Sequence, residues 1–325
     1  MVRALPQGGR YIIFTSVHVH AILKIVMATP LKITNVTKYY GRAKTPAVHN
    51  LSLAIQPGEV YGLLGANGAG KTTTLRMILD FIRPTSGHIQ LFGKDNARAN
   101  ATIRQRVGYL PGDVVLPKGA TGREFLAYLG KLSGGTDSEY VQQLTERFEA
   151  QLDKKMSQLS KGNRQKIGIM QAFMHRPDLL VLDEPTSGLD PLMQEQFYRT
   201  VSEARERGAA VLLSSHSFEE VERMCDRIGI VRGGKFVYEG TAAGIIATQK
   251  PRWRVTFKHA GDAAKLQDDP AFNVIDAGAA SLTIEPSGTI EKALAALSHH
   301  AIASMTTSQH GLEDEFLRFY EEEKR

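Results

Sequence analysis

Residues 65–72 read GANGAGKT, and this octapeptide constrains the fold more than any other part of the chain. It matches the pattern GxxxxGK followed by Ser or Thr. It lies between VYGLLG, an apolar run typical of a strand buried on both faces, and TTTLRMILDFI, which has helical periodicity. In this context the glycines allow a loop whose backbone N–H groups surround a phosphate. Lys71 supplies a cation to the phosphate oxygens, and the Thr72 hydroxyl can ligate Mg²⁺.

Two later apolar runs end in polar side chains that complete a nucleotide site. Asp183 ends the run at 179–184. Its carboxylate should emerge at the carboxyl edge of the sheet, where it can hold Mg²⁺ through water. Glu184 follows, and because a strand alternates sides we expect it to point elsewhere, toward an attacking water as general base. His216 ends the run AVLLSSH and is expected to hydrogen-bond the γ-phosphate. The predicted catalytic residues are Lys71, Glu184 and His216.

The order of elements predicts an α/β fold. LKITNVTKYY at 31–40 and VHNLSLAIQPGE at 48–59 alternate apolar and polar residues, which predicts an antiparallel β layer. The buried runs at 60–65, 179–184 and 210–215 are separated by helical segments, which favours a parallel sheet wrapped by helices. Between them, GREFLAYLGKL and EYVQQLTERFE have apolar residues at helical spacing and predict a helical insertion at about 113–165.

The composition changes after Gly240. WRVTFK and SLTIEP are typical of strands, whereas TIEKALAALS and LEDEFLRFYEEE have helical periodicity. We therefore expect a main domain at 31–250 and a small α+β domain at 251–325.

The N-terminal extension, residues 1–30, contains the run that comes nearest to a membrane span, at 11–27. His18, His20 and Lys24 interrupt it, and a span needs about 20 apolar residues. The run could be a weak signal-like segment. We favour the hypothesis that Met27 is the true start and that residues 1–26 are translated upstream sequence. The net charge of +6 decides nothing by itself, because the basic residues are spread along the chain. A single cysteine excludes an intrachain disulfide and favours a cytosolic setting.

Six motifs occur in a characteristic order: YYG, GANGAGKTT, LSKGN, LLVLDE, SGLD and SSH. Over about residues 31–245 the chain resembles the nucleotide-binding domain of ATP-binding cassette (ABC) ATPases. The resemblance implies a P-loop NTPase of ABC type, with a parallel sheet core, an antiparallel β layer and a helical subdomain. It also implies a head-to-tail dimer with two ATP molecules, each held between the P-loop of one subunit and the signature motif of the other.

The resemblance assigns further residues to the nucleotide. Tyr40 matches the aromatic residue on which adenine stacks; Tyr39 is an alternative, and both could instead pack on the edge of the sheet. LSKGN stands where the family usually has LSGGQ, so Ser160 and Gly162 keep the two positions that reach the γ-phosphate in the other subunit. The expected ATP-binding residues are Tyr40, Asn67, Gly68, Gly70, Lys71, Thr72, Thr73, Ser160 and Gly162. The expected Mg²⁺ residues are Thr72 and Asp183.

The chain departs from the family at three places. Lys161 and Asn163 replace residues of the usual signature, and Lys161 either adds a cation near the phosphates or points to solvent. Gly112 stands where the family usually has a Gln that senses Mg²⁺ and couples to the permease. Asp113, the next residue, could bind a metal-bound water. The usual coupling residue is therefore missing.

These features predict an ATP-hydrolysing subunit of an ABC transporter, peripheral on the cytoplasmic face of the cell membrane, with a separate transmembrane permease. The cassettes would pair as a homodimer or with a second cassette. Details of the motifs resemble the branch that exports drugs, antimicrobial peptides or lipids. The alternative is a soluble ABC ATPase acting on nucleic acid or ribosomes, but such proteins carry a long coiled coil or two cassettes, so no nucleic acid is expected as a partner. A catalytically silent subunit would lack Glu184 or His216.

Overall fold

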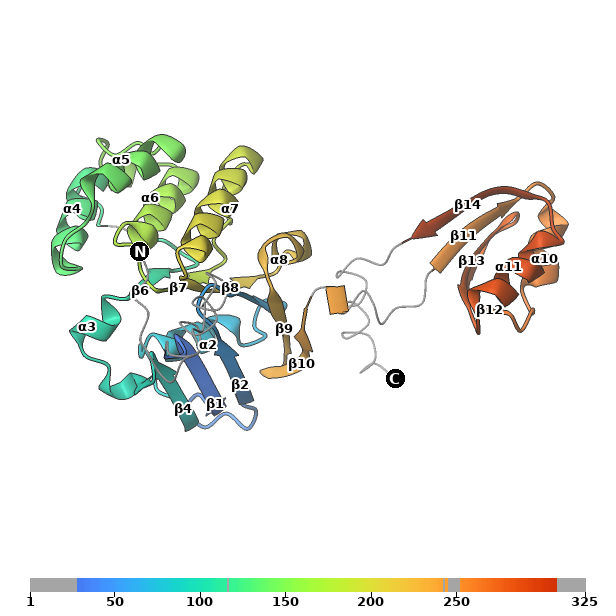
Figure 1. The fold of residues 1–325 in the computed structure, drawn as a ribbon, viewed down its shortest axis with the longest axis horizontal. Helices are drawn as coiled ribbons and strands as arrows, with labels where there is room; N and C mark the ends of the chain where they lie inside the picture. Colours follow the sequence, from blue (N-terminus) through green and yellow to red (C-terminus); the bar gives the residue numbers. More distant parts are fainter. Residues whose placement is uncertain (1–27, 116, 242, 245–251, 309–325) are drawn as a thin grey trace, which may run out of the picture. The chain divides into compact units, whose positions relative to one another are not determined.

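The computed structural model describes residues 28–115, 117–241, 243–244 and 252–308 (Figure 1). Three predictions concern residues outside these ranges. They are the hypothesis about residues 1–26, the predicted helix LEDEFLRFYEEE and the predicted domain boundary at 250/251. The described residues divide into two compact units, one made of residues up to 216 with 224–238, the other of 217–223 with residues from 239 onward. No helix within the described ranges has the length and apolar character needed to cross a membrane.

A six-stranded sheet with the order β10-β9-β3-β8-β7-β6 lies at the centre of the first unit. Five of its strands pair in parallel, from β9 through β3, β8 and β7 to β6. Every residue of β3, β7 and β8 is buried, which confirms the prediction of a parallel sheet from the three apolar runs. The strands are β3 (Val60–Leu64), β6 (Val107–Leu110), β7 (Leu179–Asp183), β8 (Ala210–Ser215), β9 (Arg227–Arg232) and β10 (Lys235–Gly240).

A second sheet, antiparallel, has the order β2-β1-β4-β5. It forms the predicted antiparallel layer, and Figure 1 shows β1, β2 and β4 side by side. One buried hydrophobic cluster contains side chains from both sheets and from the helix that follows β3, so the antiparallel layer supports the element that carries the P-loop. The strands are β1 (Leu31–Lys38), β2 (Val48–Ile55), β4 (Ser86–Leu91) and β5 (Lys94–Asp95).

Helices α4, α5 and the start of α6 occupy the predicted helical insertion and lie together in Figure 1. Arg147, at the end of α5, donates to Glu203 of α7 through both terminal nitrogens at 2.8 and 2.9 Å, which ties the insertion to the main sheet's helices. The helices are α2 (Lys71–Ile78), α3 (Ala101–Arg104), α4 (Gly122–Leu132), α5 (Ser138–Arg147), α6 (Lys161–Phe173), α7 (Pro191–Glu206) and α8 (Phe218–Met224), with 3₁₀ turns η1 (Asn96–Arg98) and η2 (Met156–Gln158).

The C-terminal domain confirms the expected α+β class. Its elements follow one another as β-α-β-β-α-β, and its antiparallel sheet has the order β12-β13-β11-β14. Trp253, the only tryptophan, is 4% exposed in a core that is separate from that of the first unit. The elements are β11 (Arg252–Phe257), α10 (Ala260–Leu266), β12 (Phe272–Ala277), β13 (Ser281–Pro286), α11 (Ile290–Ser298) and β14 (Ile302–Ser308).

Candidate functional site

The loop between β3 and α2 has a backbone that only glycine allows at two places. Gly68 and Gly70 have φ angles of 83° and 112°, in the left-handed region. A Cβ on Gly70 would also lie 2.5 Å from the carbonyl oxygen of Ala47. Helix α2 then begins at Lys71 without a side-chain cap. Its first N–H groups are therefore available to an anionic ligand, and the helix dipole favours negative charge at this end.

Lys71 is nearly buried, at 5% exposure, and its ammonium is held inside the loop. Its Nζ donates to the carbonyl oxygen of Gly65 at 2.6 Å and lies 3.3 Å from Glu184 Oε1. The cation is therefore fixed between the phosphate loop and the end of β7.

Three oxygen side chains converge beside Lys71. The Thr72 hydroxyl donates to Asp183 Oδ2 at 3.0 Å, and the Ser214 hydroxyl donates to Asp183 Oδ1 at 2.5 Å. Ser214 reaches this position because β7 and β8 pair in parallel with Asp183 opposite Ser214. The carboxylate is 4% exposed. Mg²⁺ binds through one or two carboxylates with hydroxyl, phosphate and water oxygens, so these donors fit Mg²⁺.

Glu184 follows β7 and turns away from Asp183. Its φ of 47° is unusual for a residue other than glycine. Its N–H donates to the carbonyl oxygen of Ser214 at 3.1 Å. Glu184 Oε2 lies 2.5 Å from His216 Nδ1. Asp183 and Glu184 thus contact different groups, as expected. The cause is this left-handed turn after the end of β7, whereas strand alternation was the predicted cause.

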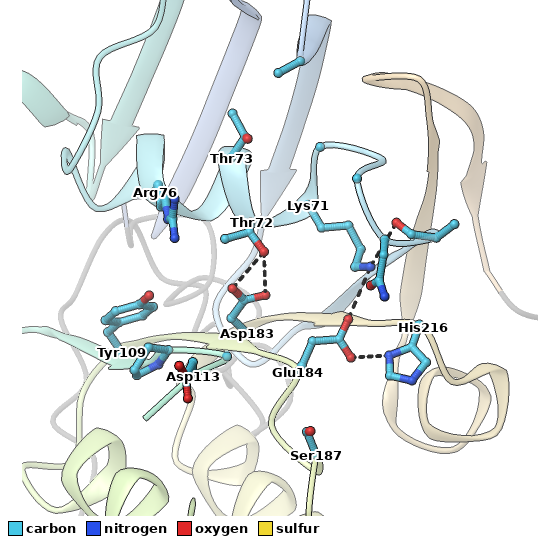
Figure 2. Close-up of a pocket in the computed structure, with 17 residues that line it drawn as sticks. Lys71, Thr72, Thr73, Arg76, Tyr109, Asp113, Asp183, Glu184, Ser187 and His216 are labelled. Carbon is cyan, nitrogen blue, oxygen red and sulfur yellow. Dashed lines mark hydrogen bonds and ion pairs between the residues drawn. The ribbon is translucent and has the colours of Figure 1, made fainter. Parts of the chain in front are cut away.

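These side chains line one cavity of about 510 Å³ (Figure 2). Most of the predicted site residues line it: Asn67, Gly68, Gly70, Lys71, Thr72, Thr73, Asp183, Glu184 and His216. It is also lined by residues outside the predicted site, including Arg76 from α2, Tyr109 from β6, Gly112, Asp113 and Ser187. The predicted active-site residues of the P-loop, β7 and β8 therefore share one cavity.

Tyr109 is half-buried on the side of the cavity away from Lys71, and its ring packs edge to face against Phe81, with centroids 5.6 Å apart. Burial, together with the negative charge of Asp183, raises the pKa of the Tyr109 phenol. The hydroxyl therefore stays protonated and polar near the Asp183 carboxylate. No sequence motif indicates that Tyr109 belongs to the site. Its position becomes evident only from the strand order, because β6 pairs with β7 and Tyr109 lies two residues after the start of β6.

Tyr40 does not line the cavity, but its hydroxyl lies 3.4 Å from Thr73 Oγ1, which does. Tyr39 and Tyr40 are 36% and 45% exposed, so neither ring is packed away at the sheet edge. The ammonium of Lys38 lies 5.5 Å from the centroid of the Tyr40 ring. A role for Tyr40 in stacking adenine stays a prediction.

The signature segment LSKGN begins α6 and is not part of the cavity lining. The Ser160 hydroxyl caps the helix by accepting from the N–H of Asn163 at 3.2 Å. Asn163, 8% exposed, accepts from the N–H of Gln151 at 3.0 Å and donates to its carbonyl oxygen at 3.3 Å. Gly162 lies against the loop after β7, because a Cβ there would be 3.0 Å from the carbonyl oxygen of Gly188. Ser160 and Gly162 are thus not brought together with the P-loop of the same chain.

Lys161 is exposed, and its side chain lies close to Gly188, where a Cβ would be 3.5 Å from Lys161 Cε. The ammonium has no hydrogen bond or ion pair to any residue in the described ranges. The structure therefore agrees with the solvent-facing alternative for a single chain.

A parallel sheet with a P-loop, a buried carboxylate beside the loop's Thr and a second carboxylate bound to Lys71 defines the class of P-loop ATPases. A family model described as "ABC transporter" matches residues 48–187. The chain is 38% identical over 216 residues to the bacitracin transport ATP-binding protein BcrA of Bacillus licheniformis, covering 66% of this chain and 70% of that protein. The chain belongs to the family of ABC transporter ATP-binding proteins and is an ATPase that couples ATP hydrolysis to transport.

Two further similarities support the family. The chain is 38% identical over 224 residues to the Nod factor export ATP-binding protein I of Paraburkholderia xenovorans (strain LB400), covering 67% of this chain and 73% of that protein. A solved structure of the ATP-binding subunit of an ABC transporter superimposes with a TM-score of 0.63 at 31% identity, covering 67% of this chain and 92% of that chain. These matches cover about two thirds of the chain.

Proposed function

We propose that the cavity binds ATP with Mg²⁺, and that the chain hydrolyses the nucleotide with Glu184 as general base. The observation that carries this proposal is the placement of Glu184 between Lys71, at 3.3 Å, and His216, at 2.5 Å. A carboxylate beside the cation that binds the γ-phosphate is in position to take a proton from a water attacking that phosphate. His216 is the hydrogen-bonding residue for the γ-phosphate in this scheme.

The other residues bind and orient the nucleotide. Lys71 and the first N–H groups of α2 bind the phosphate oxygens. Thr72 and Asp183 would hold Mg²⁺, with Ser214 fixing the orientation of Asp183 at 2.5 Å. When bound, the metal neutralises charge on the phosphate oxygens. Preorganised charges of this kind supply most of the catalysis in phosphoryl transfer.

ABC ATPases act as dimers with transmembrane partners. In this chain Ser160 and Gly162 lie outside the cavity that contains Lys71. This placement supports a head-to-tail dimer in which the signature of one subunit contacts ATP held by the other. The second cassette is another copy of this chain or a related chain.

The transported substrate leaves the cell in our proposal. The relatives named above include one for bacitracin transport and one for Nod factor export, and the sequence motifs resemble the exporters of drugs, antimicrobial peptides or lipids. The ATPase would lie peripherally on the cytoplasmic face of the membrane against a separate permease. The alternative, an ATPase acting on nucleic acid or ribosomes, is not favoured by these relatives.

The experiment is a mild-detergent purification of the tagged protein from its own membranes, followed by mass spectrometry. A stoichiometric polytopic membrane protein is the expected result, and the Lys71→Ala variant is the control that should retain it while losing ATP binding. Co-purification of ribosomes or DNA without a membrane protein would contradict the transport function. Unchanged ATP affinity in Lys71→Ala would contradict the assignment of the cavity.

A further inference from the structure

The position at which the family usually carries its metal-sensing Gln has little room for a side chain here. It is Gly112, and a Cβ built on it would lie 3.3 Å from both Cγ and Oδ2 of Asp183. Asp183 cannot give way freely, because Thr72 and Ser214 both hydrogen-bond its carboxylate. A side chain at this position would therefore press on the metal carboxylate, and the role of the Gln has to come from elsewhere.

The residue after Gly112 is placed to take that role. Asp113 lines the same cavity and is exposed to it, and Figure 2 shows it with Tyr109 on one side of Asp183, while Lys71, Glu184 and His216 lie on the other. Asp113 has no hydrogen bond or ion pair with any described residue. Val114, 9% exposed, anchors the loop, because a Cβ on Gly168 of α6 would lie 2.9 Å from its Cγ2.

The chemistry of the site requires an acceptor at this place. Mg²⁺ keeps several of its waters when it binds beside a phosphate, and each of these waters has hydrogens to donate. Three carboxylates line the cavity. Asp183 already accepts from Thr72 and Ser214, and Glu184 already contacts Lys71 and His216. Asp113 is the carboxylate among the three with all of its acceptor capacity free.

We propose that Asp113 is a positioning residue for the metal, accepting hydrogen bonds from metal-bound water in place of the family's Gln. This inference rests on the proposed function, since it requires ATP and a divalent cation in the cavity. Asp113 acts through water and does not ligate the ion. Asp113 also adds a negative charge that a Gln lacks. ATP binding at this site should therefore depend more on the divalent cation than it would with Gln.

The test measures metal binding directly, in full-length protein carrying Glu184→Gln so that ATP is not consumed. Mn²⁺ is titrated into the ATP-loaded protein and free Mn²⁺ is followed by its EPR signal. Asp113→Asn should weaken Mn²⁺ binding about 10- to 100-fold, the usual effect of removing an outer-shell partner of a metal. Asp113→Glu should recover part of the loss. The control is Asp268→Asn, which removes the same charge at an exposed position of the C-terminal domain and should leave Mn²⁺ affinity unchanged.

ATP affinity without metal is measured on the same samples. Asp113→Asn with unchanged Mn²⁺ affinity would overturn the inference, and so would a loss of ATP binding without metal, since Asp113 would then serve the nucleotide or the fold. If the protein without the Asp113 substitution bound neither ATP nor Mn²⁺, the proposed function itself would fail. Failure of the Asp113 inference and failure of the proposed function therefore give different results.

Discussion

At the scale of single residues, the backbone of Glu184 is the most informative feature. A residue other than glycine with a φ of 47° is strained by about 1–3 kcal/mol. The hydrogen bond from its N–H to Ser214, at 3.1 Å, holds it there. The strain separates two adjacent carboxylates, so that one faces Thr72 and the other faces Lys71.

Replacing Glu184 by Gln keeps the shape of the side chain and removes its basicity. We expect ATP hydrolysis to fall by about 10²–10⁴, the usual contribution of a positioned general base, while ATP still binds. Phosphate release and binding of a fluorescent ATP analogue measure the two effects. Glu139→Gln, at the exposed start of α5, is the matched control and should leave both unchanged. Near-normal turnover in Glu184→Gln would remove this residue from the base role.

His175 predicts a pH dependence of stability. It is half-buried, with Nε2 3.3 Å from the carbonyl oxygen of Val107, and burial lowers the pKa of its imidazole. Between the lowered pKa of the folded state and the unfolded value of about 6.5, the unfolded chain binds more protons. Stability should therefore fall as the pH decreases below about 6.5 and be fully present above it.

The measurement for His175 is the urea midpoint between pH 5 and pH 8, compared with His175→Gln. The substitution should reduce the loss of stability at the acidic end, since the difference between the two proteins isolates this residue from other titrating groups. Parallel curves for the two proteins would contradict the prediction.

At the scale of elements, α6 shows how a departure from a family motif can be structural. Asn163 stands where the family usually has Gln, and both ends of its amide bond the backbone of Gln151. The Ser160 hydroxyl is used by the N-cap at the same time. A side chain of this length thus fixes the start of α6 to the segment that follows α5.

Restoring the family residue with Asn163→Gln should therefore destabilise the protein. The extra methylene has to fit at a position that is 8% exposed, which costs about 1–3 kcal/mol. Chemical denaturation measures the change. The comparison is Lys161→Gly, which also restores a family residue but at an exposed position. Because residue 161 is the first residue of α6, its cost should be below the roughly 1 kcal/mol of glycine in a helix interior. A neutral Asn163→Gln would show that the space around residue 163 is adaptable.

The elements that could be predicted are those with a strong pattern of their own. The three buried runs became β3, β7 and β8, and GREFLAYLGKL became α4 with the same limits, since the Thr121 cap and the amphipathic pattern coincide. The stretch TTTLRMILDFI predicted a longer helix than the structure has. Helix α2 ends at Ile78, because Asp80 takes a left-handed conformation. Short strands such as β4 depend on pairing with β1 and have little pattern of their own.

The same distinction applies to the site. Lys71, Thr72, Asp183, Glu184 and His216 lie in motifs and were predicted to form one site. Ser214 was not, because its contact with Asp183 arises from the register of two strands 31 residues apart in sequence. Arg76 was not predicted either, since helical periodicity alone does not say which exposed position faces a ligand.

At the scale of the whole molecule, two hydrophobic clusters among the described residues lie in separate units. The first contains side chains from the two sheets of the ATPase unit, and the second contains Trp253 with the inward residues of the C-terminal sheet and helices. Since Trp253 is the only tryptophan, its fluorescence reports on the C-terminal core alone.

ATP should therefore stabilise only one of two unfolding transitions. At a concentration of about 100 times its Kd, a ligand adds about 2.7 kcal/mol to the unit that binds it. Circular dichroism should show the ATPase transition moving to higher denaturant, while the tryptophan fluorescence transition stays where it is. An equal shift of the fluorescence transition would show that the two cores unfold as one. Lys71→Ala should abolish the shift seen by circular dichroism.

If Lys71 binds the phosphates as proposed, nucleotide binding exchanges one set of contacts of its ammonium for another. Its ammonium is already bound by the carbonyl oxygen of Gly65 at 2.6 Å and by the carboxylate of Glu184 at 3.3 Å, so incoming phosphate oxygens replace ligands that the protein itself provides. The affinity gained through Lys71 is thus a difference between two sets of contacts. Because these ligands already hold the ammonium in place, little side-chain freedom is left to lose when phosphate oxygens take over from them.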